Sequence, residues 1–224
     1  FSCKDEEGQY HILGYGYDAE APSIRDIVAY GHALRMHKLD VRLDFLKTRF
    51  GFSFSEQDLT ALYALDNPGK PHIGNLMVRY GYASSKEDAI RNYIDQYRAG
   101  NAFVRPEEAI WAILGAGGIP VLAHPSYGRG DQLVLGADMD RRLRKLTGYG
   151  LQGVEVFYSG FSSELINEML SFAEQYGLYI TAGSDYHGHN KLVRLGDTNL
   201  GGAEDYPEGL RRFLDDIQDR IFVL

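Results

Sequence analysis

The fold of this chain is decided by one stretch, Ile180-Thr-Ala-Gly-Ser-Asp185-Tyr-His187-Gly188, in which a short apolar run leads directly into a turn of small residues. We predict a buried strand over residues 178–182 with a turn after it. Asp185 and His187 would point the same way in extended chain, because side chains alternate between faces. Both residue types bind Zn²⁺, Mn²⁺ or Fe²⁺. The stretch is therefore a candidate metal site, and the alternative is a helix-capping aspartate beside an exposed histidine.

A second stretch, Ile119-Pro-Val-Leu-Ala-His124-Pro125, also has a histidine at the end of a predicted strand. From residue 105 onward, helix patterns and strand patterns alternate. The helices are predicted at about 106–115, 138–147, 163–176 and 206–219, and the strands at 119–123, 153–158 and 178–182. This alternation favours parallel strands with helices outside them.

Candidate polar residues collect where these strands end. His124 follows the first strand, residues 158–162 follow the second, and Asp185 with His187 follow the third. The carboxyl ends of the strands carry the active site both in (β/α) barrels and in open doubly wound sheets. We favour the barrel, because no Gly-x-Gly-x-x-Gly motif supports dinucleotide binding and no Gly-x-Ser-x-Gly elbow is present.

The N-terminal part has a different pattern. Residues 9–17 are rich in β-forming tyrosine and predict a strand that contains His11, for which a packed, hydrogen-bonded histidine is the alternative to a ligand. Residues 22–104 predict helices joined by turns. The first of these helices begins near Ser23, which has capping-box-like spacing to Asp26.

These patterns predict two domains in an α/β protein. One is a barrel domain of residues 1–21 and 105–224, and the other is an all-helical insertion of residues 22–104. The chain has 224 residues, of which 44% are hydrophobic, enough for one sizeable core and a smaller appendage.

Charge and cysteine content restrict the class of partner and compartment. The formal charge of −8 is spread along the chain and argues against a stable nucleic-acid complex, which relies on basic surface. No apolar run approaches the length of a membrane span. The single cysteine, Cys3, excludes an intrachain disulfide and favours a reducing compartment, so we expect a cytoplasmic protein with no membrane partner.

Three motifs, in this order, resemble the later motifs of the polymerase and histidinol phosphatase (PHP) family: Val121-Leu-Ala-His124-Pro125, Gly153-Val-Glu-Val-Phe-Tyr158 and Ala182-Gly-Ser-Asp185-Tyr-His187-Gly188. Residues 10–15 and Lys70-Pro-His72-Ile73 resemble the subgroup whose barrel carries a helical insertion, which includes nucleoside-phosphate phosphatases. The resemblance implies a distorted seven-stranded TIM-like barrel. It also implies two or three divalent metal ions (Mn, Zn or Fe) at the carboxyl face.

Carried over to this sequence, the resemblance implies that His11, His124, Asp185 and His187 are metal ligands, and that Asp185 and His187 are catalytic. Glu155 is expected to orient a neighbour or to pair inside the barrel rather than to bind metal.

Basic residues near these motifs are candidates for binding substrate phosphate: Arg129, Lys191, Arg194 and His72. Arg194 is the strongest, because the comparable stretch borders the site in the subgroup. The alternative for the two arginines and the lysine is ordinary surface charge. For His72 it is a packed position at the start of a helix.

The sequence departs from the family at its beginning. The opening His-x-His strand, the Asp and His that follow it and a ligand Glu expected just before Phe1 are absent. We therefore expect an N-terminally truncated barrel that lacks its first strands, and poor activity of this chain compared with the full-length protein. Exposed strand edges would invite pairing, so a homo-oligomer is a further hypothesis.

The function expected from these features is a metal-dependent phosphoesterase. It would hydrolyse a phosphomonoester of a small nucleotide or related metabolite through a metal-activated hydroxide. One alternative is a 5′-3′ exonuclease that acts on short oligonucleotides. Another is a non-catalytic PHP remnant that acts as a binding module.

Overall fold

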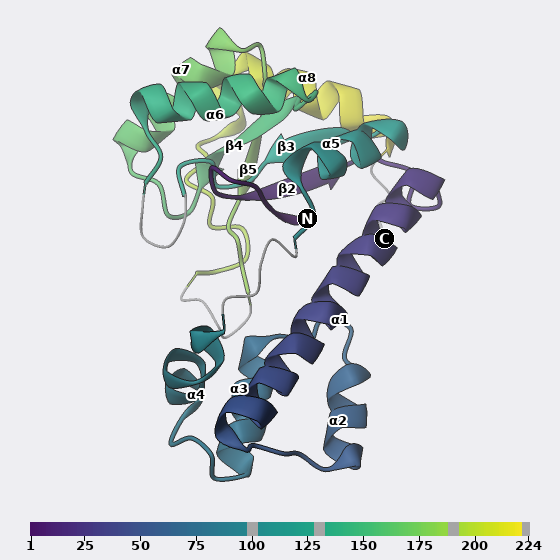
Figure 1. Cartoon of the computed structure of the whole chain (residues 1–224). Coiled ribbons are helices and arrows are strands. Elements are labelled where there is room, and N and C mark those ends of the chain that lie inside the picture. The colour runs from purple at the N-terminus through teal and green to yellow at the C-terminus, as the bar shows by residue number, and fades with distance from the viewer. Residues whose placement is uncertain (98–102, 128–132, 188–192, 221–224) are drawn as a thin grey trace. The chain divides into compact units, whose positions relative to one another are not determined.

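The computed structural model describes residues 1–97, 103–127, 133–187 and 193–220, which form two compact units (Figure 1). Unit 1 comprises Phe1–Ile27 and Arg105–Leu224, and unit 2 comprises Val28–Val104. The division falls within the long helix α1 (Pro22–Phe50), whose first six residues belong to unit 1. Each unit has its own buried apolar residues, so each is described by itself.

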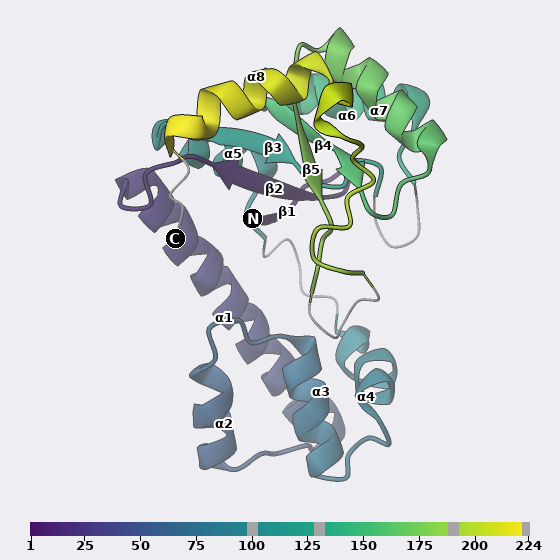
Figure 2. The same cartoon turned by 180° about the vertical axis from the view of Figure 1, so that it is seen from behind.

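Unit 1 is built on a five-stranded sheet in the order β1-β2-β3-β4-β5 (Figures 1 and 2). Its strands are β1 (Ser2–Lys4), β2 (Gln9–Tyr15), β3 (Ile119–Leu122), β4 (Gly153–Tyr158) and β5 (Tyr179–Gly183). β3, β4 and β5 are parallel, as the alternation of helices and strands predicts. The expected strands at 119–123, 153–158 and 178–182 are thus confirmed to within two residues.

The expected barrel is wrong for the described residues, because the sheet is not closed. β1 pairs antiparallel with β2, and β2 pairs antiparallel with β3 through Ile12 opposite Leu122. The short connection at residues 5–8 allows only a hairpin, since parallel strands need a long crossover. Helix and strand patterns predict elements, but they do not state the direction in which a strand pairs.

Helices cover the sheet of unit 1 where the sequence predicts them. They are α5 (Pro106–Gly115), α6 (Gly136–Gly148), α7 (Ser163–Gln175) and α8 (Glu208–Ile217), with 3₁₀ turns at Ala203–Asp205 and Gln218–Arg220. α6, α7 and α8 lie together along one side of the sheet (Figures 1 and 2). α5 packs against β1, β2 and β3. All six residues of β4 are buried, so this strand is the centre of the core.

The start of α1 differs from the predicted cap. The helix begins at Pro22, and the Ser23 hydroxyl donates a hydrogen bond to the carbonyl of Ala112 at 2.9 Å. Ser23 therefore joins α1 to α5 within unit 1. Proline suits the first helical position because its missing N–H has no partner there in any case.

The described elements of unit 2 after α1 are α2 (Glu56–Tyr63), α3 (Lys70–Arg79), α4 (Lys86–Asn92) and a 3₁₀ turn at Ile94–Gln96. Ser55 caps α2 by accepting a hydrogen bond from the N–H of Asp58. The buried core of the unit consists of Leu39, Leu46, Leu62, Ile73, Leu76, Met77, Ala89 and Ile94.

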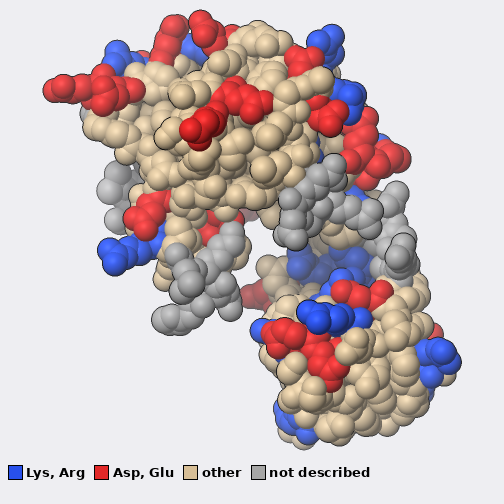
Figure 3. All heavy atoms as spheres, turned by 90° about the vertical axis from the view of Figure 1, so that its left-hand side faces the viewer, with Lys and Arg blue, Asp and Glu red and all other residues tan. Residues whose placement is uncertain are grey.

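Charges of both signs lie on the face of the molecule that Figure 3 shows. In the face shown in Figure 3, acidic and basic side chains form small groups on each unit, among larger areas without charge. In the part of the chain that the structure describes, no helix is both long enough and apolar enough to cross a membrane.

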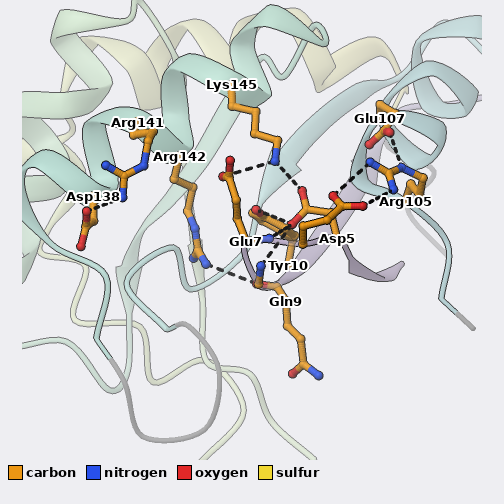
Figure 4. Close-up of polar contacts among 12 residues, drawn as sticks. Asp5, Glu7, Gln9, Tyr10, Arg105, Glu107, Asp138, Arg141, Arg142 and Lys145 are labelled. Carbon is orange, nitrogen blue, oxygen red and sulfur yellow. Dashed lines mark hydrogen bonds and ion pairs between the residues drawn. The ribbon is translucent and has the colours of Figure 1, made fainter. Parts of the chain in front are cut away.

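A buried ion pair joins the β1–β2 hairpin to α6. The Asp5 carboxylate is fully buried and accepts a hydrogen bond from Lys145 Nζ at 2.7 Å, as well as from the N–H groups of Glu7 and Gly8 (Figure 4). Burial alone would raise the pKa of Asp5, but these hydrogen bonds and the Lys145 charge lower it below its usual value.

The depressed pKa of Asp5 predicts a specific acid sensitivity. Because the folded pKa lies below the unfolded value of about 3.9, the carboxylate stabilises the fold above that pH, and this contribution is lost as the pH falls through the folded pKa. We expect the unfolding free energy from urea titrations to fall more steeply between pH 6 and pH 3 in the wild type than in Asp5→Asn. Asp138→Asn is the matched control, because its exposed pair with Arg141 should leave the slope unchanged. Equal slopes in wild type and Asp5→Asn would contradict the assignment.

Candidate functional site

The carboxyl ends of β3, β4 and β5 bring the candidate residues to one edge of the sheet. His124 lies two residues beyond β3, Tyr158 ends β4 and Asp185 lies two residues beyond β5. His11 reaches the same edge for a different reason. Because β2 runs antiparallel to β3, His11 near its amino end lies opposite the carboxyl end of β3, where the N–H of Ala123 donates to its carbonyl at 2.9 Å.

The imidazoles of His11 and His124 face each other directly. His11 Nδ1 lies 2.9 Å from His124 Nε2, and the two rings meet edge to face with centroids 4.8 Å apart. At this distance one nitrogen carries the hydrogen and the other accepts it. One hydrogen therefore lies between the two ring nitrogens.

Asp185 and His187 form a second pair beside the first. Asp185 Oδ1 lies 3.3 Å from His187 Nδ1, which also lies 2.7 Å from the Asp185 carbonyl oxygen. The carboxylate is mostly buried, with 21% of its side chain exposed, whereas 58% of the His187 side chain is exposed. The two side chains thus lie beside each other, with His187 as the outer member, although Asp185 has a left-handed φ of 52° and not the extended backbone that the sequence analysis assumed.

Electrostatic coupling links the two pairs. The pKa of His11 is lowered to about 4, first because protein atoms remove hydration from the charged ring, although part of the side chain remains exposed. Repulsion from the protonated forms of His124 and His187 contributes to this lowering, and attraction to the Asp185 carboxylate opposes it. All four residues that the sequence predicts as ligands therefore lie within electrostatic range of one another, and His11 is neutral at pH 7.

The backbone is constrained at this edge. In the described part of the chain, three non-glycine residues have left-handed φ angles: His124 at 30°, Asp185 at 52° and Asn199 at 57°. Asn199 Nδ2 donates to the carbonyls of Tyr158, Ser159 and Phe161, which holds the loop after β4. Such residues are uncommon and concentrate at functional sites.

Glu155 fixes the backbone at His124, as the sequence analysis expected of it. This carboxylate is 5% exposed and accepts a hydrogen bond from the N–H of His124 at 2.8 Å. Glu155 lies beside a register shift between β4 and β5, and such a shift changes the direction in which side chains point at a strand end. Gly183 on β5 makes room for it, because a Cβ atom there would overlap the Glu155 carboxylate.

Aromatic side chains line the same edge, two of them in the segment 158–162 that the sequence places at the end of a strand without giving it a role. The Tyr158 hydroxyl donates to Asp185 Oδ2 at 3.4 Å, and its ring lies 5.8 Å from that of His124. Tyr127 and Phe161 pack against Tyr158, with centroids 5.7 Å and 5.2 Å away. The sequence feature that indicates a role for Tyr158 is its position as the last residue of a buried strand that ends at the candidate edge.

The donor set fits a divalent transition metal in chemistry. Imidazole and carboxylate groups are ligands for Zn²⁺, Mn²⁺ and Fe²⁺. The facing nitrogens of His11 and His124, 2.9 Å apart, belong to the same candidate site. Among the described residues, however, no group of three or more His, Cys, Asp or Glu side chains is arranged to hold a metal ion. The site therefore supplies two adjacent pairs of donors rather than a closed cage.

The candidate phosphate-binding residues do not all lie in the described part of the chain. Arg129 and Lys191 lie outside it. Arg194 is exposed, and its backbone N–H donates to Asp197 Oδ2 at 3.2 Å. His72 belongs to unit 2, where its Nδ1 accepts a hydrogen bond from the N–H of Gly69 at 3.1 Å and so caps α3.

Known proteins resemble this chain along most of its length, although no protein-family model matches it. A 3′,5′-nucleoside bisphosphate phosphatase of Chromobacterium violaceum is 26% identical over 221 residues, which cover 94% of this chain and 72% of that protein. A 5′-3′ exoribonuclease of Haemophilus influenzae is 26% identical over 83% of this chain and 67% of its own length. A crystal structure assigned as a metal-dependent phosphoesterase from Bifidobacterium adolescentis superposes with a TM-score of 0.72 at 26% identity, over 100% of this chain and 75% of that one. The relatives and this structural neighbour are thus PHP-like phosphoesterases, the class that the motifs of this chain resemble.

Proposed function

We propose that this protein is a metal-dependent phosphomonoesterase that acts on a small nucleotide or related metabolite. One observation carries the proposal: His11, His124, Asp185 and His187 meet at the carboxyl edge of the sheet, in electrostatic contact. The similarity to a nucleoside bisphosphate phosphatase over 94% of the chain supports the substrate class.

In this proposal His11, His124, Asp185 and His187 hold two or three divalent ions. Bound there, such ions would polarise a phosphoryl oxygen and lower the pKa of a water molecule. Other features of the chain would favour metal binding by these residues. The low pKa of His11 keeps a ring-nitrogen lone pair available at pH 7. The Tyr158 hydroxyl orients the Asp185 carboxylate. Glu155 holds the backbone of His124. Mn²⁺, Zn²⁺ and Fe²⁺ all suit this donor set.

Substrate phosphate would be bound by cationic side chains near the edge. Arg194 is the first candidate, because it is exposed and follows β5 along the same segment as Asp185 and His187. Arg129 and Lys191 remain candidates from the sequence. His72 belongs to unit 2, which we propose to be a helical insertion between β2 and β3.

A second candidate is a 5′-3′ exonuclease that acts on short oligonucleotides. It is favoured by the similarity to exoribonucleases of Haemophilus influenzae and Salmonella typhimurium, each 26% identical. The same edge would serve both reactions, because each cleaves a phosphate ester. The formal charge of −8, which is spread along the chain, favours a small substrate over a long nucleic acid.

Metal removal gives the test of this function. After treatment with EDTA and gel filtration, full-length protein is expected to lose at least 90% of its phosphate release from a 3′,5′-nucleoside bisphosphate, and Mn²⁺ should restore it, because the donors act only through the ion. A parallel assay with a labelled five-nucleotide RNA separates the two candidates. Activity that survives EDTA would contradict the metal proposal. No turnover of either substrate, with any of the three metals, would favour a binding module.

A further inference from the structure

Arg142 on α6 is a buried cation that contacts the backbone of both histidine-bearing segments. Only 6% of the residue is exposed. Its Nη1 donates to the carbonyl of Pro125 at 2.8 Å and to that of Tyr127 at 3.0 Å, and its Nη2 donates to the carbonyl of Gln9 at 3.4 Å. Figure 4 shows the side chain extending from α6 toward Gln9 on β2.

The carbonyls that Arg142 contacts are next to the proposed ligands. Pro125 and Tyr127 belong to the turn that begins at His124, which is closed by a 3.0 Å hydrogen bond from the N–H of Tyr127 to the His124 carbonyl. Gln9 lies two residues before His11 on β2, so both side chains belong to the same face of the strand. One planar guanidinium therefore ties the His124 turn to the start of the His11 strand.

The guanidinium is itself held in place. It lies over the ring of Tyr10, 4.8 Å from the ring centre, and the Tyr10 hydroxyl donates to Asp5 Oδ1 at 3.1 Å. Lys145, one turn along α6, bonds the same carboxylate at 2.7 Å (Figure 4). The residue stays in position through a cation–π contact and three carbonyls, and no carboxylate among the described residues forms an ion pair with it.

We infer that Arg142 is a positioning residue that sets the separation of the His11 and His124 imidazoles and thereby the metal affinity of the site. Two opposite buried charges hold His124, since Glu155 binds its N–H while Arg142 binds carbonyls of the following turn. The two contacts lie on either side of the His124 backbone, whose φ of 30° is uncommon for a residue other than glycine. The part that concerns metal rests on the proposed function.

The geometry of the guanidinium distinguishes arginine from other residues here. Its fork reaches several acceptors at fixed angles, whereas a lysine ammonium is a single point on a flexible stem. Lysine at this position would keep the charge and lose the simultaneous contacts to the turn and to Gln9. Methionine would keep much of the volume and leave the carbonyls without their donor.

The test compares Arg142→Met and Arg142→Lys with Leu143→Ala in the full-length protein. Leu143 is fully buried on the same helix, so its truncation lowers stability without removing a bond to either histidine segment. Mn²⁺ affinity is measured by calorimetry on metal-free protein, and metal-free crystal structures give the distance between His11 Nδ1 and His124 Nε2. If Arg142→Met does not fold, Arg142→Lys is the variant on which both measurements are made.

Both Arg142 variants are expected to bind Mn²⁺ about 10-fold to 100-fold more weakly than the wild type. Their crystal structures should show the two ring nitrogens beyond hydrogen-bond distance and His124 outside the left-handed region. Leu143→Ala should retain wild-type affinity and wild-type geometry. The inference is overturned if the Arg142 variants keep the 2.9 Å contact, or if Leu143→Ala weakens Mn²⁺ binding as much as they do. A wild type that binds no Mn²⁺ would defeat the proposed function, while the crystal structures would still decide whether Arg142 positions the histidines.

Discussion

Replacing Asp185 with Asn is expected to lower kcat/KM for nucleoside bisphosphate hydrolysis by about 1,000-fold, which corresponds to about 4 kcal/mol of transition-state stabilisation. The substitution keeps the size of the side chain and removes its negative charge. Asparagine also tolerates the left-handed φ of 52° at this position, so the backbone should not change. The loss would therefore report the charge alone.

The measurement is phosphate release by full-length protein in saturating Mn²⁺, with unfolding followed in parallel. Asp215→Asn is the matched control, because this exposed carboxylate lies on α8 and its removal should change the rate less than twofold. His187→Ala should also be strongly impaired, although less so, since its side chain is 58% exposed. Turnover of Asp185→Asn within threefold of the wild type would remove Asp185 from the site.

Adding one methyl group at Gly183 is expected to destabilise the fold by about 3 kcal/mol, at the upper end of the usual cost of overpacking. A Cβ atom at this position would overlap the buried Glu155 carboxylate. Glu155 would have to move, and the N–H of His124 would lose its acceptor. We therefore expect Gly183→Ala to lower both the unfolding free energy in urea and the affinity for Mn²⁺.

A double-variant cycle separates this overlap from a general effect of alanine. In a Glu155→Ala background, the additional cost of Gly183→Ala should shrink to less than about 1 kcal/mol, because the two positions are coupled. Gly148→Ala is the control for the added methyl, since a Cβ atom there would meet nothing within 4 Å. It should be neutral or slightly stabilising. Additive effects of Gly183→Ala and Glu155→Ala would show that the clash is not the cause.

Local patterns were sufficient for most of the secondary structure. Pro106 begins α5 as predicted, and Ser55 caps α2, because caps and prolines act on the nearest turn of chain. The parallel strands β3, β4 and β5 also follow from apolar runs between helices. His124 and Asp185 could be expected at one edge, since the carboxyl ends of parallel strands meet there.

Other features depend on contacts between distant residues and have no local signal. The antiparallel direction of β2, which brings His11 to His124, is a property of pairing rather than of either segment. For the same reason the predicted barrel is wrong for the described residues, whose sheet is not closed. Ser23 appeared to be a helix cap and instead bonds Ala112, 89 positions along the chain.

The sequence by itself determined the α/β class, the strand ends and the residue types of a metal site, because these depend on periodicity and on short motifs. Only the tertiary structure decided which groups face one another and what fixes them. Three contacts each join separate elements: the 2.9 Å contact between the two imidazoles, the hydrogen bond from the His124 N–H to the buried Glu155, and the hydrogen bonds of the Arg142 guanidinium. Their energies depend on burial and on angles that arise only when the elements pack, so no pattern along the chain could have predicted them.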